Sequence, residues 1–250
     1  MLARRQIVGI NFNLIAAGEV VGALRRWIES SHRGYVALAN PHSVLAAHRD
    51  QDFRKALLGA DITLPDGVGI TLAARLLGCR DVVRVAGPGL MLDLCDSGRQ
   101  HAFRHYFYGG REGVAAALAT RLTARYEGLE IAGTCCPPFR RLTPEEDSRI
   151  VQTINATRPD IVWVGLGTGT QEKWMAAHVG RIEAAALIGV GAAFDFHAGT
   201  VPWAPAWIRN AGLEWAYRLV HEPRRLWRRN LDSPVFLARV IAQRLASASD

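Results

Sequence analysis

The chain has 250 residues, of which 49% are apolar and 21% are charged, so its composition is that of a folded globular protein and excludes a disordered one. The formal net charge is +7, and Lys55 and Lys173 are the only lysines, so nearly all of the positive charge is arginine. Arginine suits phosphates and carboxylates, and the charge indicates anionic partners such as nucleotides, diphosphates, lipid headgroups or nucleic acid. The base composition of the genome is an alternative source of an arginine-rich chain.

The cysteines and the apolar segments bear on the cellular compartment. None of the four cysteines forms a C-x-x-C pair, which argues against a zinc site and a disulfide framework and favours a reducing cytosol. The longest weakly polar stretch, residues 184–194, has about half of the ~20 residues that a membrane-spanning helix needs. The N-terminus lacks the long apolar region of a signal peptide. We expect a cytoplasmic protein that does not span the membrane.

Short apolar runs alternate with helical patterns along most of the chain. The predicted strands are, in chain order, residues 7–11, 35–39, 62–64, 82–85, 104–108, 129–132, 161–164 and 186–190. Helical periods lie between them, for example at residues 20–30, 44–58, 113–126 and 144–156. This alternation predicts an α/β fold with a Rossmann-like, mostly parallel sheet flanked by helices. Ligands bind beyond the carboxyl ends of such strands, so the residues after each strand are the candidates for function.

Polar residues follow the second and third predicted strands. Asn40 precedes Pro41, a pair typical of a helix N-cap and first helical residue, and the alternative role for Asn40 is to bind a sugar or base. Asp66 and Gly67 belong to a Pro-Asp-Gly turn signal. Many such aspartates only hold a turn, but a carboxylate at a strand end can also take the proton of an acceptor hydroxyl as a general base.

Glycines follow several of the other strands. Gly87 and Gly89 come after Arg84, and Gly109 and Gly110 follow the next strand. Each pair can open a helix whose first amides face a phosphate, although a tight turn explains the glycines equally well.

Residues 165–169 read G-x-G-x-G rather than the dinucleotide fingerprint G-x-G-x-x-G, which argues against a nicotinamide or flavin enzyme. Gly167 lies in this loop, and Gln171 and Glu172 follow it at a helix start, where they can orient a nucleotide or a sugar. Asp195 follows the last strand and is either a ligand contact or a structural cap.

We expect no required metal and no cofactor. The string Asp50-Gln51-Asp52 matches the metal-binding Asp-x-Asp pattern, but it falls in a helical period, where side chains two residues apart diverge by roughly 200°. Asp195 and His197 have a similar spacing without an evident third ligand.

The composition changes near residue 200. Four of the seven tryptophans follow it, and residues 209–229 hold six arginines and two glutamates, a local balance of +4. We expect residues 1–199 to form an α/β catalytic core that binds a nucleotide sugar, and residues 200–250 to form an Arg- and Trp-rich helical appendage close to the membrane. The alternative is ordinary packing, with the tryptophans in a core and the arginines on a solvated face.

The joint order and spacing of these motifs resemble the WecG/TagA/CpsF glycosyltransferase family over about residues 6–236. The strings that carry the resemblance are Asn40-Pro41, Pro65-Asp66-Gly67, Gly109-Gly110, Gly165-Leu166-Gly167 with Gln171-Glu172, Phe194-Asp195, Gly212-Leu213-Glu214-Trp215, Tyr217-Arg218-Leu219, Glu222-Pro223 and Arg228-Arg229. Two departures are Leu38, where the family often has threonine, and Trp203, where it tends to have arginine. The first puts one substrate hydrogen bond in doubt, and the second removes one cation.

The resemblance implies an inverting transfer from a UDP-sugar to an undecaprenyl-diphosphate-linked sugar, without a required metal, in bacterial surface or exopolysaccharide synthesis. It implies Asp66 as the catalytic base, with Asn40 and tail arginines in the same site. The full set of expected substrate-binding residues is Asn40, Gly67, Arg84, Gly87, Gly109, Gly110, Gly167, Gln171, Glu172, Asp195, Arg218, Arg225 and Arg229.

The expected partners are the UDP-sugar, the polyprenyl-diphosphate-linked acceptor and the inner face of the cell membrane, where the protein is peripheral. Exposed apolar surface on the appendage would favour homo-oligomers away from the membrane. The two rival functions are nucleic-acid binding and an oxidoreductase. The sequence shows no helix-turn-helix, zinc finger or aromatic strand platform, so we expect no nucleic acid as partner.

Overall fold

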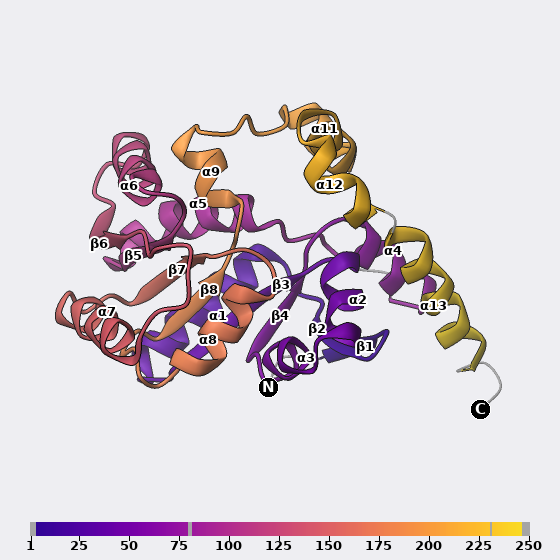
Figure 1. The fold of residues 1–250 in the computed structure, drawn as a ribbon, viewed down its shortest axis with the longest axis horizontal. Helices are drawn as coiled ribbons and strands as arrows, with labels where there is room; N and C mark the ends of the chain where they lie inside the picture. The colour runs from indigo at the N-terminus through magenta and orange to yellow at the C-terminus, as the bar shows by residue number, and fades with distance from the viewer. Residues whose placement is uncertain (1–3, 80–81, 231, 247–250) are drawn as a thin grey trace.

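A computed structural model describes the backbone of residues 4–79, 82–230 and 232–246 and, except at residues 225 and 228–230, their side chains. Its centre is a parallel six-stranded sheet in the order β4-β3-β8-β7-β5-β6 (Figure 1). The strands are β3 (Gly34–Ala39), β4 (Ile62–Pro65), β5 (Arg104–Gly109), β6 (Glu130–Cys135), β7 (Ile161–Gly165) and β8 (Ala186–Gly189). The predicted α/β class with a mostly parallel sheet is confirmed.

Helices cover both faces of the sheet because the central strands are apolar on both sides. In β3, Tyr35, Ala37 and Ala39 join one core cluster, and Val36 and Leu38 join the other, so the strand is a continuous buried run. The first cluster is covered by α2 (Pro41–Arg49), α3 (Gln51–Leu58), α7 (Pro144–Ala156) and α8 (Thr170–His178). The second is covered by α1 (Ala17–Glu29), α5 (Gly87–Gly98), α6 (Val114–Arg125) and α9 (Ala193–Ala198).

The chain begins with a separate antiparallel hairpin of β1 (Arg4–Ile7) and β2 (Ile10–Asn13). The prediction of one strand over residues 7–11 is therefore wrong. Val8 and Gly9 have φ angles of 48° and 75°, and positive φ at both central residues is the requirement of a type I′ hairpin turn. The side chain of Asn13 accepts a hydrogen bond from the Thr63 amide at 3.0 Å, which joins the hairpin to β4.

The predicted strand at residues 82–85 is also wrong. Residues 82–86 are described without regular secondary structure, and the Val85 amide donates to the Pro65 carbonyl at 3.1 Å, next to the end of β4. Val82 and Val85 are buried in the two core clusters, which explains the apolar pattern without a strand.

The helix predicted over residues 44–58 is broken at Asp50, which ends α2 and caps α3 by accepting the Phe53 amide at 2.9 Å. Asp50 also pairs with Lys173 at 2.9 Å, while Asp52 lies 3.8 Å from Lys55. The two carboxylates therefore pair with different lysines, as their expected divergence requires. The reason differs from the predicted one, because Asp50 is the N-cap of α3 and only Asp52 lies within the helix.

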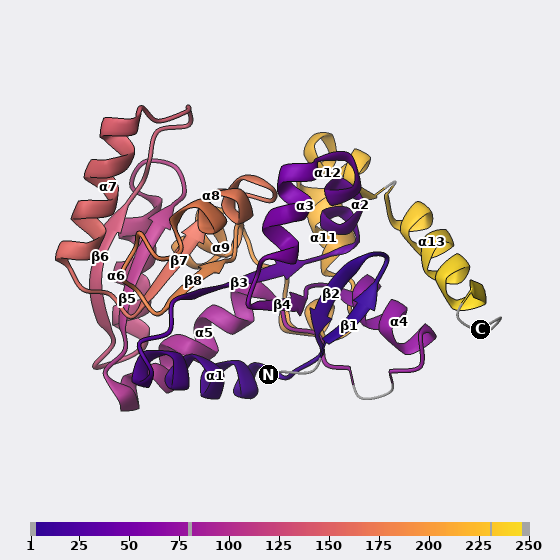
Figure 2. The same ribbon diagram turned by 90° about the horizontal axis from the view of Figure 1, so that it is seen from below.

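The C-terminal helices lie at one end of the molecule, beyond α4 (Val68–Leu76) (Figures 1 and 2). They are α10 (Ala206–Asn210), α11 (Glu214–His221), α12 (Pro223–Asn230) and α13 (Asp232–Ala246). None of the residues of α10 and α11 is fully buried, whereas Phe236 and Val240 of α13 join the first core cluster and α13 packs against α2 and α4. A division of the chain at residue 200 stays a prediction.

The first residue of α13 anchors this helix to the sheet domain. Asp232 is buried and accepts hydrogen bonds from His42 at 2.6 Å and Arg49 at 3.0 Å, both in α2. Burial opposes ionisation of Asp232, but the hydrogen bonds from His42 and Arg49 outweigh it and lower the pKa of the carboxyl.

We expect Asp232→Ala to lower the free energy of unfolding by about 1–3 kcal/mol, because it removes a largely buried carboxylate that accepts two charge-assisted hydrogen bonds. Urea unfolding at neutral pH measures this change. Asp52→Ala is the matched control, since Asp52 is also an acidic residue in the first turn of a helix but its side chain is 80% exposed. Equal losses in the two variants would contradict the anchoring role.

Candidate active site

The site is built where the strands β4, β3 and β8 end side by side. Asp66 follows β4, Asn40 follows β3, and Gly191 lies two residues beyond β8. The helix after β3 covers one face of the sheet and the helix after β8 covers the other. Open α/β sheets bind their ligands at such a point, where the connections of neighbouring strands leave in opposite directions.

Asp66 is partly buried among charged groups from distant parts of the chain. Burial raises the pKa of the carboxyl, Arg84 and Arg218 oppose this rise, and Glu214 adds to it, so the net shift is upward. The side chain of Asn40 lies close enough to the Asp66 carboxyl to lower its pKa by hydrogen bonding. The carboxyl is therefore more basic than an exposed aspartate but has cations close enough to favour its ionised form.

Asn40 also caps α2. Its Oδ1 accepts hydrogen bonds from the Ser43 amide at 3.1 Å and from the Ser43 hydroxyl at 3.3 Å. Because Oδ1 serves the cap, the amide nitrogen is the part of the side chain that can donate to Asp66. The helix-cap reading and the site reading of Asn40 are thus compatible.

An ion pair attaches the C-terminal helices to this strand end. Arg84 Nη2 lies 2.5 Å from Glu214 Oε2, and the two side chains are only 21% and 14% exposed. Arg84 Nη1 also donates to the Arg209 carbonyl at 3.3 Å. Glu214 was not predicted as a site residue. An acidic residue within an arginine-rich segment is the sequence feature that could have indicated it.

Two arginines lie on a pair of stacked aromatic rings beside the ion pair. The Arg218 guanidinium lies 5.4 Å from the centroid of Phe196, whose ring stacks on Trp203 at 6.4 Å. The Arg209 guanidinium lies 3.6 Å from the centroid of Trp203. The Nε atoms of Arg209 and Arg218 are buried and have no hydrogen-bond partner among the described residues. Arg209 was not predicted as a site residue. It places a guanidinium against Trp203, the position where the family tends to have arginine.

Several helices begin at the same edge. The helices α2, α4 and α8 follow β3, β4 and β7 within a few residues, and α5 follows residues 82–86. They begin at Pro41, Val68, Thr170 and Gly87, respectively. A side chain at Gly87 would lie 3.4 Å from the Val190 carbonyl, so α5 begins against the end of β8. Amides in the first turn of a helix lack intrahelical partners and attract anions.

The predicted glycines divide into two kinds. Gly67, the N-cap of α4, and Gly167 have φ angles of 86°, and a side chain at Gly167 would meet open space. A Cβ atom at Gly109 would lie 2.6 Å from the Gly165 backbone, and one at Gly110 would lie 2.8 Å from Val114. Close packing therefore explains Gly109 and Gly110, and their role toward phosphate stays a prediction.

Gln171 and Glu172 are almost fully buried, at 4% and 1% exposure. Glu172 accepts hydrogen bonds from the Gly169 amide at 2.6 Å and from Gln171 Nε2 at 3.0 Å. Burial raises the pKa of Glu172 to about 7 against these hydrogen bonds.

Asp195 and two of the predicted arginines remain. Asp195 lies in the first turn of α9 and accepts the Thr200 hydroxyl at 3.1 Å; the N-cap of this helix is Ala192, and a ligand contact of Asp195 stays a prediction. His197 uses Nε2 to bind the Pro88 carbonyl at 2.8 Å. The side chains of Arg225 and Arg229 lie outside the described residues. In the described part of the chain no three potential metal-binding side chains are grouped together, and metal independence stays a prediction.

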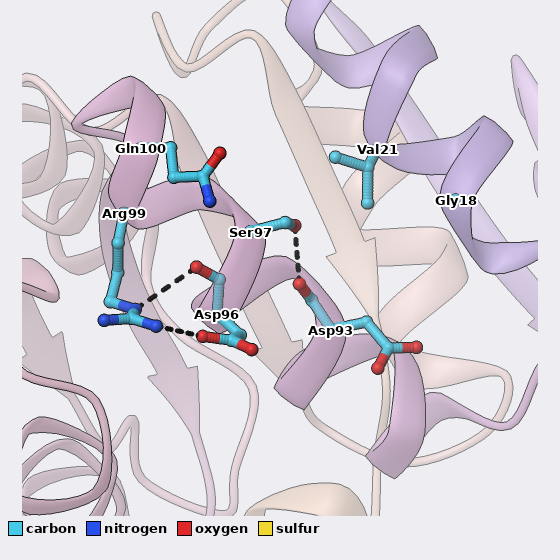
Figure 3. Close-up of a pocket in the computed structure, with 7 residues that line it drawn as sticks. All are labelled: Gly18, Val21, Asp93, Asp96, Ser97, Arg99 and Gln100. Carbon is cyan, nitrogen blue, oxygen red and sulfur yellow. Dashed lines mark hydrogen bonds and ion pairs between the residues drawn. The ribbon is translucent and has the colours of Figure 1, made fainter.

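A surface depression of about 430 Å³ lies elsewhere, between α1 and the C-terminal half of α5 (Figure 3). Its lining residues are Gly18, Val21, Asp93, Asp96, Ser97, Arg99 and Gln100. Asp96 already pairs with Arg99 there. Asp93 is the lining residue of α5 nearest to Gly87, and six residues at 1.5 Å each place it about 9 Å along the helix from the strand ends. Its two aspartates make it unsuited to a diphosphate.

Among the described residues, no helix combines the length and the apolar character that a bilayer crossing requires.

Known proteins resemble this chain over nearly its whole length. The model of the glycosyl transferase WecG/TagA/CpsF family matches residues 5–250. A Bacillus spizizenii relative is 31% identical over 89% of this chain and 84% of its own length. A Bacillus subtilis relative is 28% identical over 88% of this chain and 83% of its own length. A Staphylococcus aureus relative is 25% identical over 95% of this chain and 92% of its own length. All three relatives bear the name N-acetylglucosaminyldiphosphoundecaprenol N-acetyl-beta-D-mannosaminyltransferase. The chain therefore belongs to the WecG/TagA/CpsF family of glycosyltransferases.

Proposed function

We propose that this protein is an inverting glycosyltransferase that moves a sugar from a UDP-sugar to an undecaprenyl-diphosphate-linked sugar in bacterial surface or exopolysaccharide synthesis. The observation that carries the proposal is Asp66, which follows β4 at a strand end and has Asn40, Arg84 and Arg218 close enough to lower the pKa of its carboxyl. The relatives' names support N-acetylglucosaminyl-diphosphoundecaprenol as the first acceptor to test and N-acetylmannosamine as the first sugar.

In this proposal Asp66 is the general base. It takes the proton of the acceptor hydroxyl as the hydroxyl oxygen attacks the anomeric carbon of the donor. The bond from that carbon to UDP breaks, and its electron pair leaves with the diphosphate. A single displacement of this kind inverts the anomeric configuration. Partial burial favours this role, because it raises the pKa of the carboxyl toward the pH at which the enzyme works.

The leaving diphosphate needs positive charge that is fixed in advance. The donors at this edge are the Nε groups of Arg209 and Arg218, which have no partner among the described residues, and the first amides of α5, which has no side-chain cap. Charge-assisted hydrogen bonds from arginine to phosphate are among the stronger polar interactions in proteins. We propose that these groups stabilise the leaving group without a required metal.

We expect Asp66→Asn to lower the acceptor-dependent release of UDP by at least ~100-fold, because the amide cannot take the proton. The assay uses a panel of UDP-sugars with the lipid-diphosphate-sugar acceptor in the presence of EDTA, and wild-type activity should survive the chelator. Asp93→Asn is the matched control, since Asp93 lies in the depression of Figure 3. A fully active Asp66→Asn variant would contradict Asp66 as the base, and loss of wild-type activity in EDTA would contradict metal independence.

We further propose that the C-terminal helices bind the inner membrane surface. Trp207 is 69% exposed, Trp215 is 52% exposed and Val220 is 77% exposed, on helices that also carry arginines. Tryptophan and arginine are favoured at the boundary between lipid headgroups and acyl chains. A lipid-linked acceptor would reach the site from this surface. The same apolar surface would pair two copies of the chain away from the membrane.

We expect the double substitution Trp207→Ser and Val220→Ser to lower binding to phosphatidylglycerol vesicles about tenfold or more, because two exposed apolar side chains no longer enter the lipid. Cosedimentation measures the bound fraction. Phe139→Ser is the control, because Phe139 is 80% exposed on the β6–α7 loop at the opposite edge of the sheet. Equal binding of the double variant and the wild type would overturn the proposal. Truncation is a poorer test, since Phe236 and Val240 belong to the core.

A further inference from the structure

We propose that Glu172 is a positioning residue that fixes the side-chain amide of Gln171, so that the Gln171 carbonyl oxygen accepts a hydrogen bond from the nucleotide sugar. This inference rests on the proposed function, because it concerns the donor substrate of the same site.

The orientation of the Gln171 amide follows from its neighbour. Gln171 Nε2 donates to Glu172 Oε1 at 3.0 Å. Burial raises the pKa of Glu172 to about 7, and the ionised form that predominates above this pH only accepts hydrogen bonds, so the nitrogen end of the amide then faces Glu172. The opposite rotation would bring two oxygen atoms together. Gln171 Oε1 therefore points away from Glu172, and it is buried without a hydrogen-bond partner among the described residues.

The unpartnered oxygen lies at the end of β8. A Cβ atom added to Gly189 would come within 3.0 Å of Gln171 Nε2, and one added to Gly191 would come within 3.4 Å of Gln171 Oε1. The amide thus lies over the strand end against which α5 begins. Asp66 follows β4, which is two strand positions away in the sheet, or roughly 10 Å at the usual spacing between strands.

A buried carbonyl oxygen without a hydrogen-bond partner is unfavourable, so a ligand that supplies a donor is favoured at this position. Phosphate oxygens that carry no proton are acceptors and cannot bind Gln171 Oε1. The donor must be an O–H or N–H group of the nucleotide sugar. Two parts of that molecule carry such groups: the nucleoside, through its ribose hydroxyls and base N–H, and the transferred sugar.

The second oxygen of Glu172 holds the preceding loop. Glu172 Oε2 accepts the Gly169 amide at 2.6 Å. Gly167 and Gly169 have φ angles of 86° and 85°, a backbone conformation that favours glycine, and the hydrogen bond to Glu172 holds the Gly169 end of this loop. One carboxylate therefore sets both the loop and the amide that follows it.

The test measures binding of UDP and of the UDP-sugar by titration calorimetry, which does not depend on turnover. Gln171→Leu removes the acceptor, and Glu172→Gln keeps the size but provides only one acceptor oxygen for two donors. We expect each variant to weaken binding of the UDP-sugar by about five- to tenfold, the usual worth of one hydrogen bond. Equal weakening for UDP places the donor on the nucleoside, and weakening for the UDP-sugar alone places it on the transferred sugar.

The double variant separates positioning from general damage. If Glu172 acts through Gln171, combining Gln171→Leu with Glu172→Gln weakens binding less than the product of the two single effects. Gln152→Leu and Glu145→Gln are the matched controls on the exposed face of α7 and should bind as the wild type does. Thermal unfolding checks each variant, and Gln171→Leu alone still tests the acceptor if Glu172→Gln does not fold.

Wild-type affinity in Gln171→Leu would overturn the proposed hydrogen bond. Fully multiplicative effects in the double variant would overturn Glu172 as the residue that positions Gln171. Failure of the wild-type protein to bind UDP or any UDP-sugar would overturn the proposed function itself, and this inference with it.

Discussion

A carboxylate that is partly withdrawn from water needs cations close to it, and Asp66 obtains them from two distant parts of the chain. Arg84 precedes α5 in the sheet domain, and Arg218 belongs to the C-terminal helices. Arg84 is itself paired with Glu214 of α11, so the segment that follows β4 and the C-terminal helices share one electrostatic network. The chemistry proposed for Asp66 therefore depends on the docking of those helices. The hydrogen bonds of Asp232 to His42 and Arg49 also hold the C-terminal helices in place, because they attach α13 to α2.

Much of the fold could be predicted because the physical signals are local. A buried parallel strand is a short apolar run, and a helix beside it has a 3.6-residue period, so the alternation is visible in the sequence. The errors arose where two structures share one pattern. Residues 82–85 are apolar because they fill the core at Val82 and Val85, not because they join a ladder. At Asp50 a side-chain cap divides a continuous helical period into two helices.

The candidate site was harder to predict than the fold, because side chains meet there through tertiary contacts. The strand-end rule was sufficient to select Asn40 and Asp66. It could not select Arg209, whose role depends on a tryptophan six residues earlier, or show that Glu214 neutralises part of the charge on Arg84. It also could not distinguish Gly109, where a neighbouring backbone excludes any side chain, from Gly167, which faces open space. The sequence offers the same residue type in both places.

We propose that a uridine nucleotide binds at the joint ends of β4, β3 and β8 and contacts the C-terminal helices. Hydrogen exchange of backbone amides with and without saturating UDP tests this binding site. We expect slower exchange at the start of α5 (residues 87–90), in the loop before α8 (residues 167–171) and in α11, with no change at residues 93–100 in the depression of Figure 3. Protection confined to residues 93–100, with the strand ends unchanged, would contradict it.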